Sequence, residues 1–204
     1  MIRLLFISFF LSCYISNSNE AVILGDQTWM KKNLSVTTYQ NGDEIPHVQD
    51  PKLWAELKTG AWCFVEEERQ DYGRLYNWYA INDPRGLAPE SWKVPSNSDW
   101  DQLIDFLGGQ ERAGKKLKSK RGWKNNGSGN NSSRLNCLPG AGRTKTGGVF
   151  GNLGGNVGYW TATEIVNKSA RSSAWSKNLD FYSSKVYTYK VSKQNGFYVK
   201  CVKP

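Results

Sequence analysis

Acidic side chains gather in two short stretches, and paired carboxylates are the groups with which many hydrolases carry out acid–base chemistry. The first stretch is Glu66–Glu68, and the second contains Asp99, Asp101 and Asp105. Glycoside hydrolysis needs two carboxyl groups that face each other across a cleft. We expect Glu66–Glu68 to form a loop tip, and Asp99 to cap a helix because it follows Ser96 by three positions. Neither stretch predicts a catalytic pair.

One histidine and one cysteine are the remaining candidates for nucleophilic chemistry. His47 lies in a polar, proline-containing loop. Because it is the single histidine, any Ser-His-Asp triad or Cys-His dyad would have to include it. Cys137 would need a lowered pKa and a neighbouring base, and Arg134 and Arg143 lie close to it in sequence. We expect a solvated histidine and a buried, inert thiol. The sequence names no catalytic residue, although an enzyme that uses Cys137 or a carboxylate pair in a cleft stays an open alternative.

Metal ligands at a recognisable spacing are missing from the sequence. Cys63, Cys137 and Cys201 are too far apart, and histidine is too scarce, for a zinc site. We therefore expect no metal and no cofactor. In an oxidising compartment, three cysteines would give one disulfide and one spare thiol.

Aromatic residues are abundant, with 9 Trp and 10 Tyr in the chain. Sugars stack on exposed aromatic faces, so a carbohydrate-binding surface is one explanation of this richness. Trp54, Trp123 and Trp175 stand among polar residues and are the candidates for such a surface. The other explanation is core packing, which we expect for four further tryptophans. These are Trp29, Trp78, Trp92 and Trp160.

The formal net charge of +9 permits the binding of anions without showing it. Basic residues are concentrated between Lys115 and Lys124. The favoured interpretation is a solvated helix end, where cations face the carbonyl-rich C-terminus. A patch for nucleic acid or for an acidic glycan is the alternative, and nucleic acid is not the partner we expect.

The N-terminus has the pattern of an export signal. Arg3 precedes a short apolar run, and small polar residues follow from Ser12, so residues 1–18 are expected to be a signal peptide. Cleavage after Ser18 would release the protein. Cleavage before Cys13 would end the signal at residue 12 and leave a lipidated cysteine, because Phe10-Leu11-Ser12-Cys13 resembles a bacterial lipobox. Both sites stay open, and only the second ties the protein to a membrane.

The remaining chain predicts one α+β domain. A capping box at Ser96 and Asp99 starts a helix that ends at Gly108-Gly109, and a second, weaker helix covers 110–118. The stretch 122–158 is rich in glycine and is expected to be a long, ordered loop region. Strands are expected near both ends of the domain, and an Asn-Gly turn is expected to join the last two. The expected strands and strand segments are 22–24, 27–30, 34–39, 61–65, 158–163, 173–179, 185–191 and 196–202.

Several short sequence motifs, in order along residues 22–203, resemble those of the Fibrobacter succinogenes major paralogous domain. They are Gly25-x-Gln27-x-Trp29-Met30, Tyr72-Gly73-Arg74-Leu75-Tyr76-Asn77-Trp78, Trp92-x-Val94-Pro95-Ser96, Leu138-Pro139-Gly140, Gly158-Tyr159-Trp160 and Asn195-Gly196-Phe197-x-Val199-x-Cys201-Val202. The resemblance implies a C-type-lectin-like fold with two helices, a small twisted antiparallel sheet and a long loop region. It also implies export, often as a lipoprotein, and gives no established biochemical function.

The same resemblance implies roles for individual residues. Cys63 and Cys201 match cysteine positions that are common in the family, which implies a disulfide between them and leaves Cys137 free. Lys93 stands where many members have histidine, so no histidine role carries over. The motifs with which calcium-dependent lectins hold their ion are absent, and Asn82-Asp83-Pro84 has similar residue types in another order.

These observations predict an exported, noncatalytic binding module, secreted or held at the bacterial outer membrane or cell surface. Its ligand would be a carbohydrate or another protein. The alternative is an enzyme of the formylglycine-generating or hydrolase type that uses Cys137 or a carboxylate pair.

Overall fold

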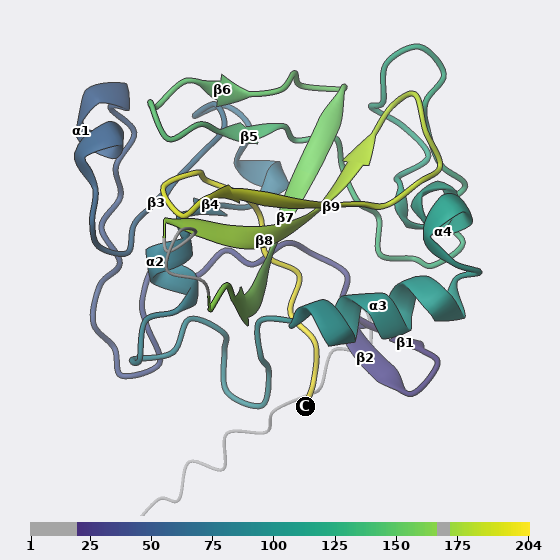
Figure 1. Ribbon diagram of the computed structural model, residues 1–204, viewed down its shortest axis with the longest axis horizontal. Coiled ribbons are helices and arrows are strands. Elements are labelled where there is room, and N and C mark those ends of the chain that lie inside the picture. Colours follow the sequence, from purple (N-terminus) through teal and green to yellow (C-terminus); the bar gives the residue numbers. More distant parts are fainter. Residues whose placement is uncertain (1–19, 167–171) are drawn as a thin grey trace, which may run out of the picture.

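The computed structural model describes residues 20–166 and 172–204, so the expected signal peptide, its two cleavage sites and Cys13 lie outside the described residues. Its largest sheet has three antiparallel strands in the order β7-β8-β9 and lies at the centre of the molecule (Figure 1). The strands are β7 (Asn156–Glu164), β8 (Ser173–Asp180) and β9 (Tyr187–Ser192). This mixed α and β architecture agrees with the expected class.

Three small antiparallel hairpins surround the sheet. They are β1 (Ala21–Leu24) with β2 (Gln27–Met30), β3 (Trp62–Cys63) with β4 (Leu75–Tyr76), and β5 (Gly142–Arg143) with β6 (Val149–Phe150). The first hairpin was expected, and the strand expected over 61–65 is reduced to two residues. Residues 34–39 contain a single bridge, between Thr38 and Glu44, in place of the expected strand segment.

The C-terminal segment 196–202 connects the hairpins to the central sheet. Isolated bridges join Phe197 to Tyr76 and Val202 to Trp29, and Tyr198 lies parallel to Tyr159 of β7. The predicted hairpin between 185–191 and 196–202 is therefore wrong. The turn at Asn195 forms, but the following residues leave β9 because Phe197 and Tyr198 are fully buried between the other elements.

Four α-helices occur among the described residues: α1 (Pro51–Glu56), α2 (Trp78–Ile81), α3 (Asn97–Phe106) and α4 (Gln110–Leu117). The capping box that starts α3 is confirmed. The Ser96 hydroxyl accepts from the Asp99 N–H at 3.1 Å, and the Asp99 carboxylate accepts from the Ser96 N–H at 2.7 Å. Gly108 and Gly109, with φ of 98° and 87°, separate α3 from α4. No helix among the described residues is long and apolar enough to cross a membrane.

Ser96→Ala is expected to lower the free energy of unfolding by about 1 kcal/mol, because the Asp99 N–H loses its side-chain acceptor. Denaturant titration measures the change. Asp105→Ala is the control, since Asp105 is exposed on the same helix and makes no ion pair among the described residues. Equal losses in the two variants would contradict a capping role for Ser96.

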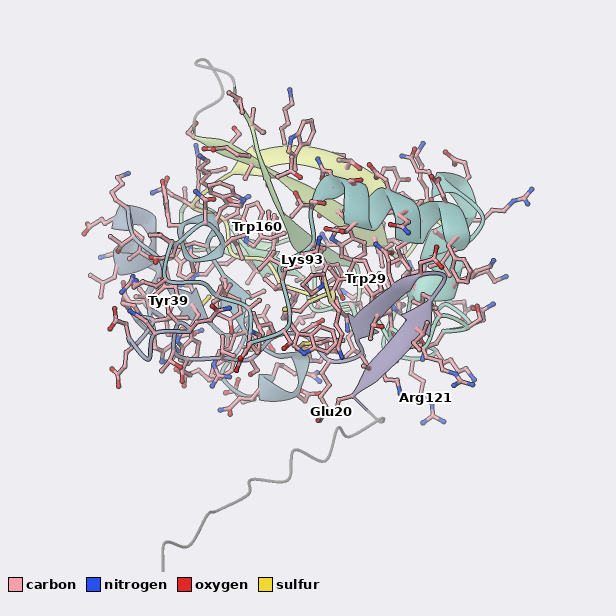
Figure 2. All side chains as sticks on the ribbon, turned by 90° about the horizontal axis from the view of Figure 1, so that it is seen from below. Glu20, Trp29, Tyr39, Lys93, Arg121 and Trp160 are labelled. Atoms are coloured by element: carbon pink, nitrogen blue, oxygen red, sulfur yellow. The ribbon has the colours of Figure 1, made fainter. Side chains whose placement is uncertain are left out.

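Tryptophan and tyrosine make up most of the largest fully buried side chains. Trp29 packs on Trp100 with ring centroids 4.9 Å apart, and Trp160 packs on Phe197 at the same separation. Figure 2 labels Trp29, which belongs to β2, and Trp160, which belongs to β7. The expectation that Trp29, Trp78 and Trp160 are core residues is confirmed, while Trp92 is only half-buried at the edge of the core.

The glycine-rich region forms ordered loops, as expected, and contains β5 and β6. Its path brings backbone segments so close that side chains would not fit. A Cβ on Gly127 would lie 2.1 Å from the carbonyl oxygen of Phe181, and one on Gly147 would lie 2.2 Å from that of Pro51. These loops are held by packing against the rest of the domain.

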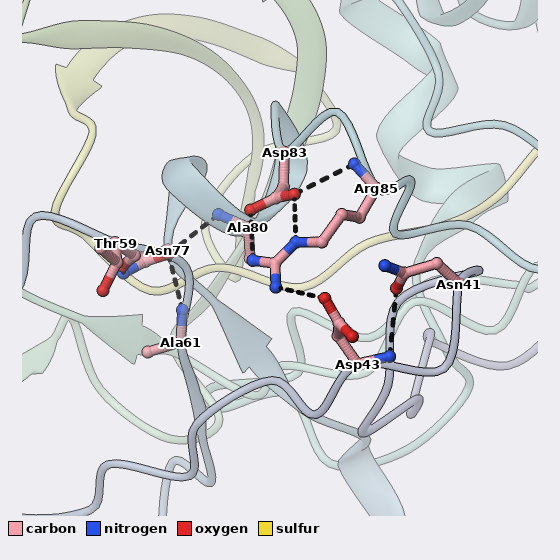
Figure 3. Close-up of polar contacts among 8 residues, drawn as sticks. All are labelled: Asn41, Asp43, Thr59, Ala61, Asn77, Ala80, Asp83 and Arg85. Atoms are coloured by element: carbon pink, nitrogen blue, oxygen red, sulfur yellow. Dashed lines mark hydrogen bonds and ion pairs between the residues drawn. The ribbon is translucent and has the colours of Figure 1, made fainter.

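Two polar clusters fix the loops around α2 (Figure 3). Asn77 accepts from the N–H groups of Ala61 and Ala80, both at 3.1 Å, and donates to the Thr59 carbonyl at 2.8 Å. On the neighbouring surface, the Arg85 guanidinium donates two bonds of 2.8 Å to Asp83.

Candidate functional site

A cavity of about 510 Å³ lies where three loops meet the C-terminal segment, and we call it the Lys200 pocket. The loops are the residues after β2, the 3₁₀ turn Gln70–Tyr72 with Gly73, and part of the glycine-rich region. The lining residues are Lys31, Lys32, Asn33, Ser35, Gln70, Asp71, Tyr72, Gly73, Asn136, Leu138 and Lys200. A cavity of this size is typical of sites for small molecules, which usually measure about 300–1,000 Å³.

Backbone contacts hold the walls of the pocket in place. The Asn33 side chain donates to the Tyr72 carbonyl at 2.8 Å, and the Leu34 N–H donates to the Val199 carbonyl at 2.8 Å. Gly73 has φ of 86°, and a Cβ there would lie 2.9 Å from the Cβ of Asn33. Only glycine allows this approach without strain. The Tyr72 ring is half-buried against Gly140, where a Cβ would lie 2.7 Å from Tyr72 Cδ1.

Lys200 is an unusual lining residue because only 1% of its surface is exposed. Its ammonium donates to the Leu135 carbonyl at 2.9 Å and to the Lys31 carbonyl. No carboxylate among the described residues forms an ion pair with it. Burial lowers the pKa of Lys200 to about 8. The pocket therefore has a cation at its base whose charge is balanced only by carbonyl dipoles.

A buried polar group of side chains adjoins Lys200. It comprises Cys137, Cys201 and Tyr159, of which Cys137 and Cys201 interact electrostatically with the lysine. Burial raises the pKa of the Cys137 thiol, an effect that the charge of Lys200 only partly opposes. The thiol of Cys137 is thus protonated at neutral pH, and its side chain is fully buried. Cys137 does not meet the requirement for an exposed nucleophile.

The family assignment follows from a match that covers nearly the whole described chain. The family model described as the Fibrobacter succinogenes major domain matches residues 22–203. The chain belongs to this family. No curated protein and no solved structure matches it.

The carboxylates of this Fibrobacter succinogenes major domain do not converge on the pocket. Glu66–Glu68 are exposed, as expected for a loop tip, and Asp99 is occupied as a cap. Asp101 pairs with the buried Lys177 at 2.7 Å. Asp71 is the one carboxylate that lines the pocket among the described residues. The part of the chain that the structure describes also contains no group of three or more His, Cys, Asp or Glu side chains that could hold a metal ion.

Asp83 lies in the segment compared above with calcium-lectin motifs, and its carboxylate forms an ion pair with Arg85. Arg85 binds both of its oxygens and lowers the pKa of the carboxyl. Arg85 also donates to Asp43 at 3.0 Å, and its guanidinium lies 4.1 Å from the ring centroid of Tyr39. His47 is exposed, as expected, and its ring stacks on Trp62 at 4.0 Å.

Two of the three tryptophans proposed for sugar stacking are buried, which corrects the prediction for them. Trp54 is fully buried and donates to the Gln194 carbonyl at 2.8 Å. Trp123 is 6% exposed, and its indole donates to the Ser119 hydroxyl at 3.0 Å. Polar neighbours in the sequence indicated exposure, but both indoles are buried, and their hydrogen-bond partners are the nearby Ser119 for Trp123 and the distant Gln194 for Trp54. Trp175 is half-buried, with the Lys190 ammonium 5.0 Å from its ring.

The predicted disulfide between Cys63 and Cys201 is wrong, because all three described cysteines are free thiols. Cys63 and Cys201 lie in different clusters of the core. The thiol of Cys63 interacts with Arg143, whereas that of Cys201 lies near Lys200 and Tyr76. Burial raises the pKa of both thiols to about 12.

Thiol labelling under non-reducing conditions is expected to leave Cys63, Cys137 and Cys201 unmodified in the native protein, because all three are buried. After denaturation, all three are expected to react. Peptide mapping by mass spectrometry assigns each label, and a reduced sample is the control. Labelling of only one of the three in the unreduced, denatured protein would contradict the free-thiol assignment.

The pocket itself was not found from the sequence. Lys200 stands in the run Phe197-Tyr198-Val199-Lys200-Cys201-Val202, whose other members are all buried. A lysine within such a run was the signal that would have indicated an internal cation, because lysine is almost never fully buried without a partner. Asn33 and Tyr72 lie within or beside phrases shared with the family, but their meeting depends on the fold.

Proposed function

We propose that this domain is an exported, noncatalytic binding module and that its ligand is a carbohydrate bound in the Lys200 pocket. The observation that carries the proposal is the combination of Tyr72, whose ring is half-buried, with the amides of Asn33, Gln70 and Asn136. An aromatic face packs against the C–H groups of a sugar, and amides both donate to and accept from its hydroxyls. Asp71 supplies a charged acceptor, and the buried Lys200 ammonium gives this part of the pocket a positive charge.

The chemistry of the pocket supports binding more than catalysis. Its lining contains one carboxylate, and the neighbouring Cys137 is a buried thiol with a raised pKa. A hydrolase of the glycosidase type would need a second carboxylate opposite the first. We further propose that the fold is of the C-type-lectin-like type, which helices α3 and α4, the small three-stranded sheet and the long loops support.

Export is part of the same proposal and rests on the sequence of residues 1–18. The mature protein would lie outside the cytoplasm, either free or held by a lipid on Cys13. The intact mass of the mature protein distinguishes the two, because cleavage after Ser18 and lipidation at Cys13 leave different N-termini.

A glycan array followed by calorimetry tests the binding proposal with the wild type and Tyr72→Ala. Loss of the aromatic face is expected to weaken binding about tenfold, which corresponds to roughly 1.4 kcal/mol. Tyr182→Ala is the matched control, since Tyr182 is 67% exposed outside the pocket. Unchanged affinity in Tyr72→Ala would place the ligand elsewhere. Binding of the wild type to no glycan on the array would contradict a carbohydrate ligand.

A further inference from the structure

The surface of α4 and of the loops after it carries cations that no carboxylate neutralises. Most of these side chains are exposed, and Lys116 is half-exposed. None of them appears in an ion pair among the described residues. We call this set the α4 basic surface, and it consists of Arg112, Lys115, Lys116, Lys120, Arg121, Lys124 and Arg134. Figure 2 shows Arg121 projecting from the molecule.

Local acidic groups do not offset this charge. Glu111, at the start of α4, pairs with Lys185 at 2.8 Å. Lys118 belongs to the same run of the sequence but is buried, and its ammonium donates to the carbonyls of Asp180 and Ser183 at 3.1 and 2.9 Å. The run is therefore more than a solvated helix end. It divides into one internal lysine and a set of surface cations without ion pairs among the described residues, which gives this face a positive potential that attracts anions.

The loop 130–137 connects the α4 basic surface to the Lys200 pocket. At one end, the N–H groups of Asn130 and Ser133 donate to the carbonyls of Lys115 and Lys116 at 2.9 and 3.2 Å. At the other end, the Leu135 carbonyl accepts from Lys200, and Asn136 lines the pocket. The exposed Arg134 lies between the two. Arg134 therefore adds one exposed cation to the segment of chain between α4 and the pocket.

We propose that the α4 basic surface and the Lys200 pocket together bind an acidic polysaccharide, with one sugar in the pocket and the anionic groups of its neighbours on the cations. This inference rests on the proposed function of the pocket and extends it. Several separate cations fit a chain with repeated anionic groups better than a single small anion. Carboxylate and sulfate groups both supply this chemistry, so the test includes polymers of each kind.

The aromatic residues favour a polysaccharide over a nucleic acid. Proteins that bind single strands stack the bases on exposed aromatic rings set among their cations. The one aromatic residue within the run 115–124 is Trp123, which is 6% exposed and lies beneath the Lys118 ammonium at 5.0 Å. Bases would find no stacking surface within this run.

The experiment compares two triple variants of equal net charge in the full mature protein. One removes cations of the α4 basic surface: Lys115→Gln, Lys120→Gln and Arg121→Gln. The matched control removes three exposed lysines elsewhere: Lys52→Gln, Lys58→Gln and Lys145→Gln. Lys52 lies in α1, on the opposite side of Figure 1 from α4. Binding of polygalacturonate, dextran sulfate, neutral dextran and single-stranded DNA is measured by calorimetry over a series of salt concentrations.

The expected result is that the wild type binds polygalacturonate or dextran sulfate more tightly than neutral dextran and DNA. The α4 triple variant is expected to lose about tenfold in affinity for the acidic polymer, with a shallower dependence on salt, because fewer counterions are released. The control variant should bind within about twofold of the wild type.

Equal losses in the two triple variants would overturn the inference, because net charge alone would then explain binding. Tighter binding of DNA would assign the surface to nucleic acid and overturn it as well. Sugar binding that requires Tyr72 but is equal for neutral and acidic polymers would overturn the inference and leave the proposed function intact. Failure of all glycans to bind would overturn both.

Discussion

Asn77→Ala is expected to lower the free energy of unfolding by about 3 kcal/mol or more, because three backbone groups lose a partner and each such loss costs at least about 1 kcal/mol. Asn77 is fully buried and connects three backbone groups. The Ala61 N–H and the Thr59 carbonyl depend on this side chain for the bonds of 3.1 and 2.8 Å that Figure 3 shows. The third bond caps α2 at the N–H of Ala80. The bonds to Ala61 and Ala80 are buried, so water cannot replace the amide at these two groups without opening the core.

Two further variants make the Asn77 experiment specific. Asn77→Ser keeps an oxygen that can cap α2 but cannot reach all three groups, so its loss should be intermediate. Asn82→Ala, at the exposed C-terminal end of the same helix, should change stability by less than about 0.5 kcal/mol. Chemical denaturation followed by tryptophan fluorescence measures all three. A loss in Asn77→Ala no larger than that in Asn82→Ala would show that the three bonds contribute little.

The local parts of the fold follow from local signals in the sequence. The Ser96 and Asp99 pair, the apolar spacing after it and the two glycines at 108 and 109 predict α3 because each acts within one or two helical turns. The β1–β2 hairpin and the strands β7, β8 and β9 likewise follow from alternation over a few residues. The long loops follow from a concentration of glycine.

Long-range pairings do not follow from such signals. Asn195-Gly196 predicts a reversal, but the partner of the next segment depends on which surface buries Phe197 and Tyr198, and that surface belongs to β4 and β7. The same reasoning explains the cysteines. The family resemblance implied a disulfide between Cys63 and Cys201. The two residues lie in separate core clusters instead, and that placement follows from the packing of the whole domain.

Side-chain exposure within a polar run is equally hard to predict. Lys115 and Lys118 are three positions apart in the same basic run, but one is exposed and the other is inside, bonded to carbonyls from 62 and 65 residues away. The candidate site is hard to predict for the same reason. Asn33, Tyr72, Asn136 and Lys200 come from four distant segments, and composition alone does not indicate that they meet.

The stability of the protein relative to a Lys200→Met variant is expected to rise by about 3 kcal/mol between pH 7.5 and 10.5. This figure follows from about 1.4 kcal/mol for each pH unit by which burial lowers the pKa of Lys200, from 10.5 to about 8. Below pH 8, the lysine is charged in both the folded and the unfolded state, and the folded protein bears the full cost of burying the charge. Between pH 8 and 10.5, the unfolded chain holds more protons, so stability increases with pH.

The comparison with Lys200→Met isolates this titration, because the variant fills similar space without a titratable group. Loss of the bonds to the Lys31 and Leu135 carbonyls adds a cost that does not change with pH. Other tyrosines and cysteines titrate in both proteins. Denaturant titration at a series of pH values gives the difference in free energy of unfolding between the wild type and the variant. Lys52→Met, at an exposed lysine, is the control, and its difference from the wild type should not change with pH. A flat difference for Lys200→Met would mean that the Lys200 ammonium is solvated, and the pocket would then lack the desolvated cation described above.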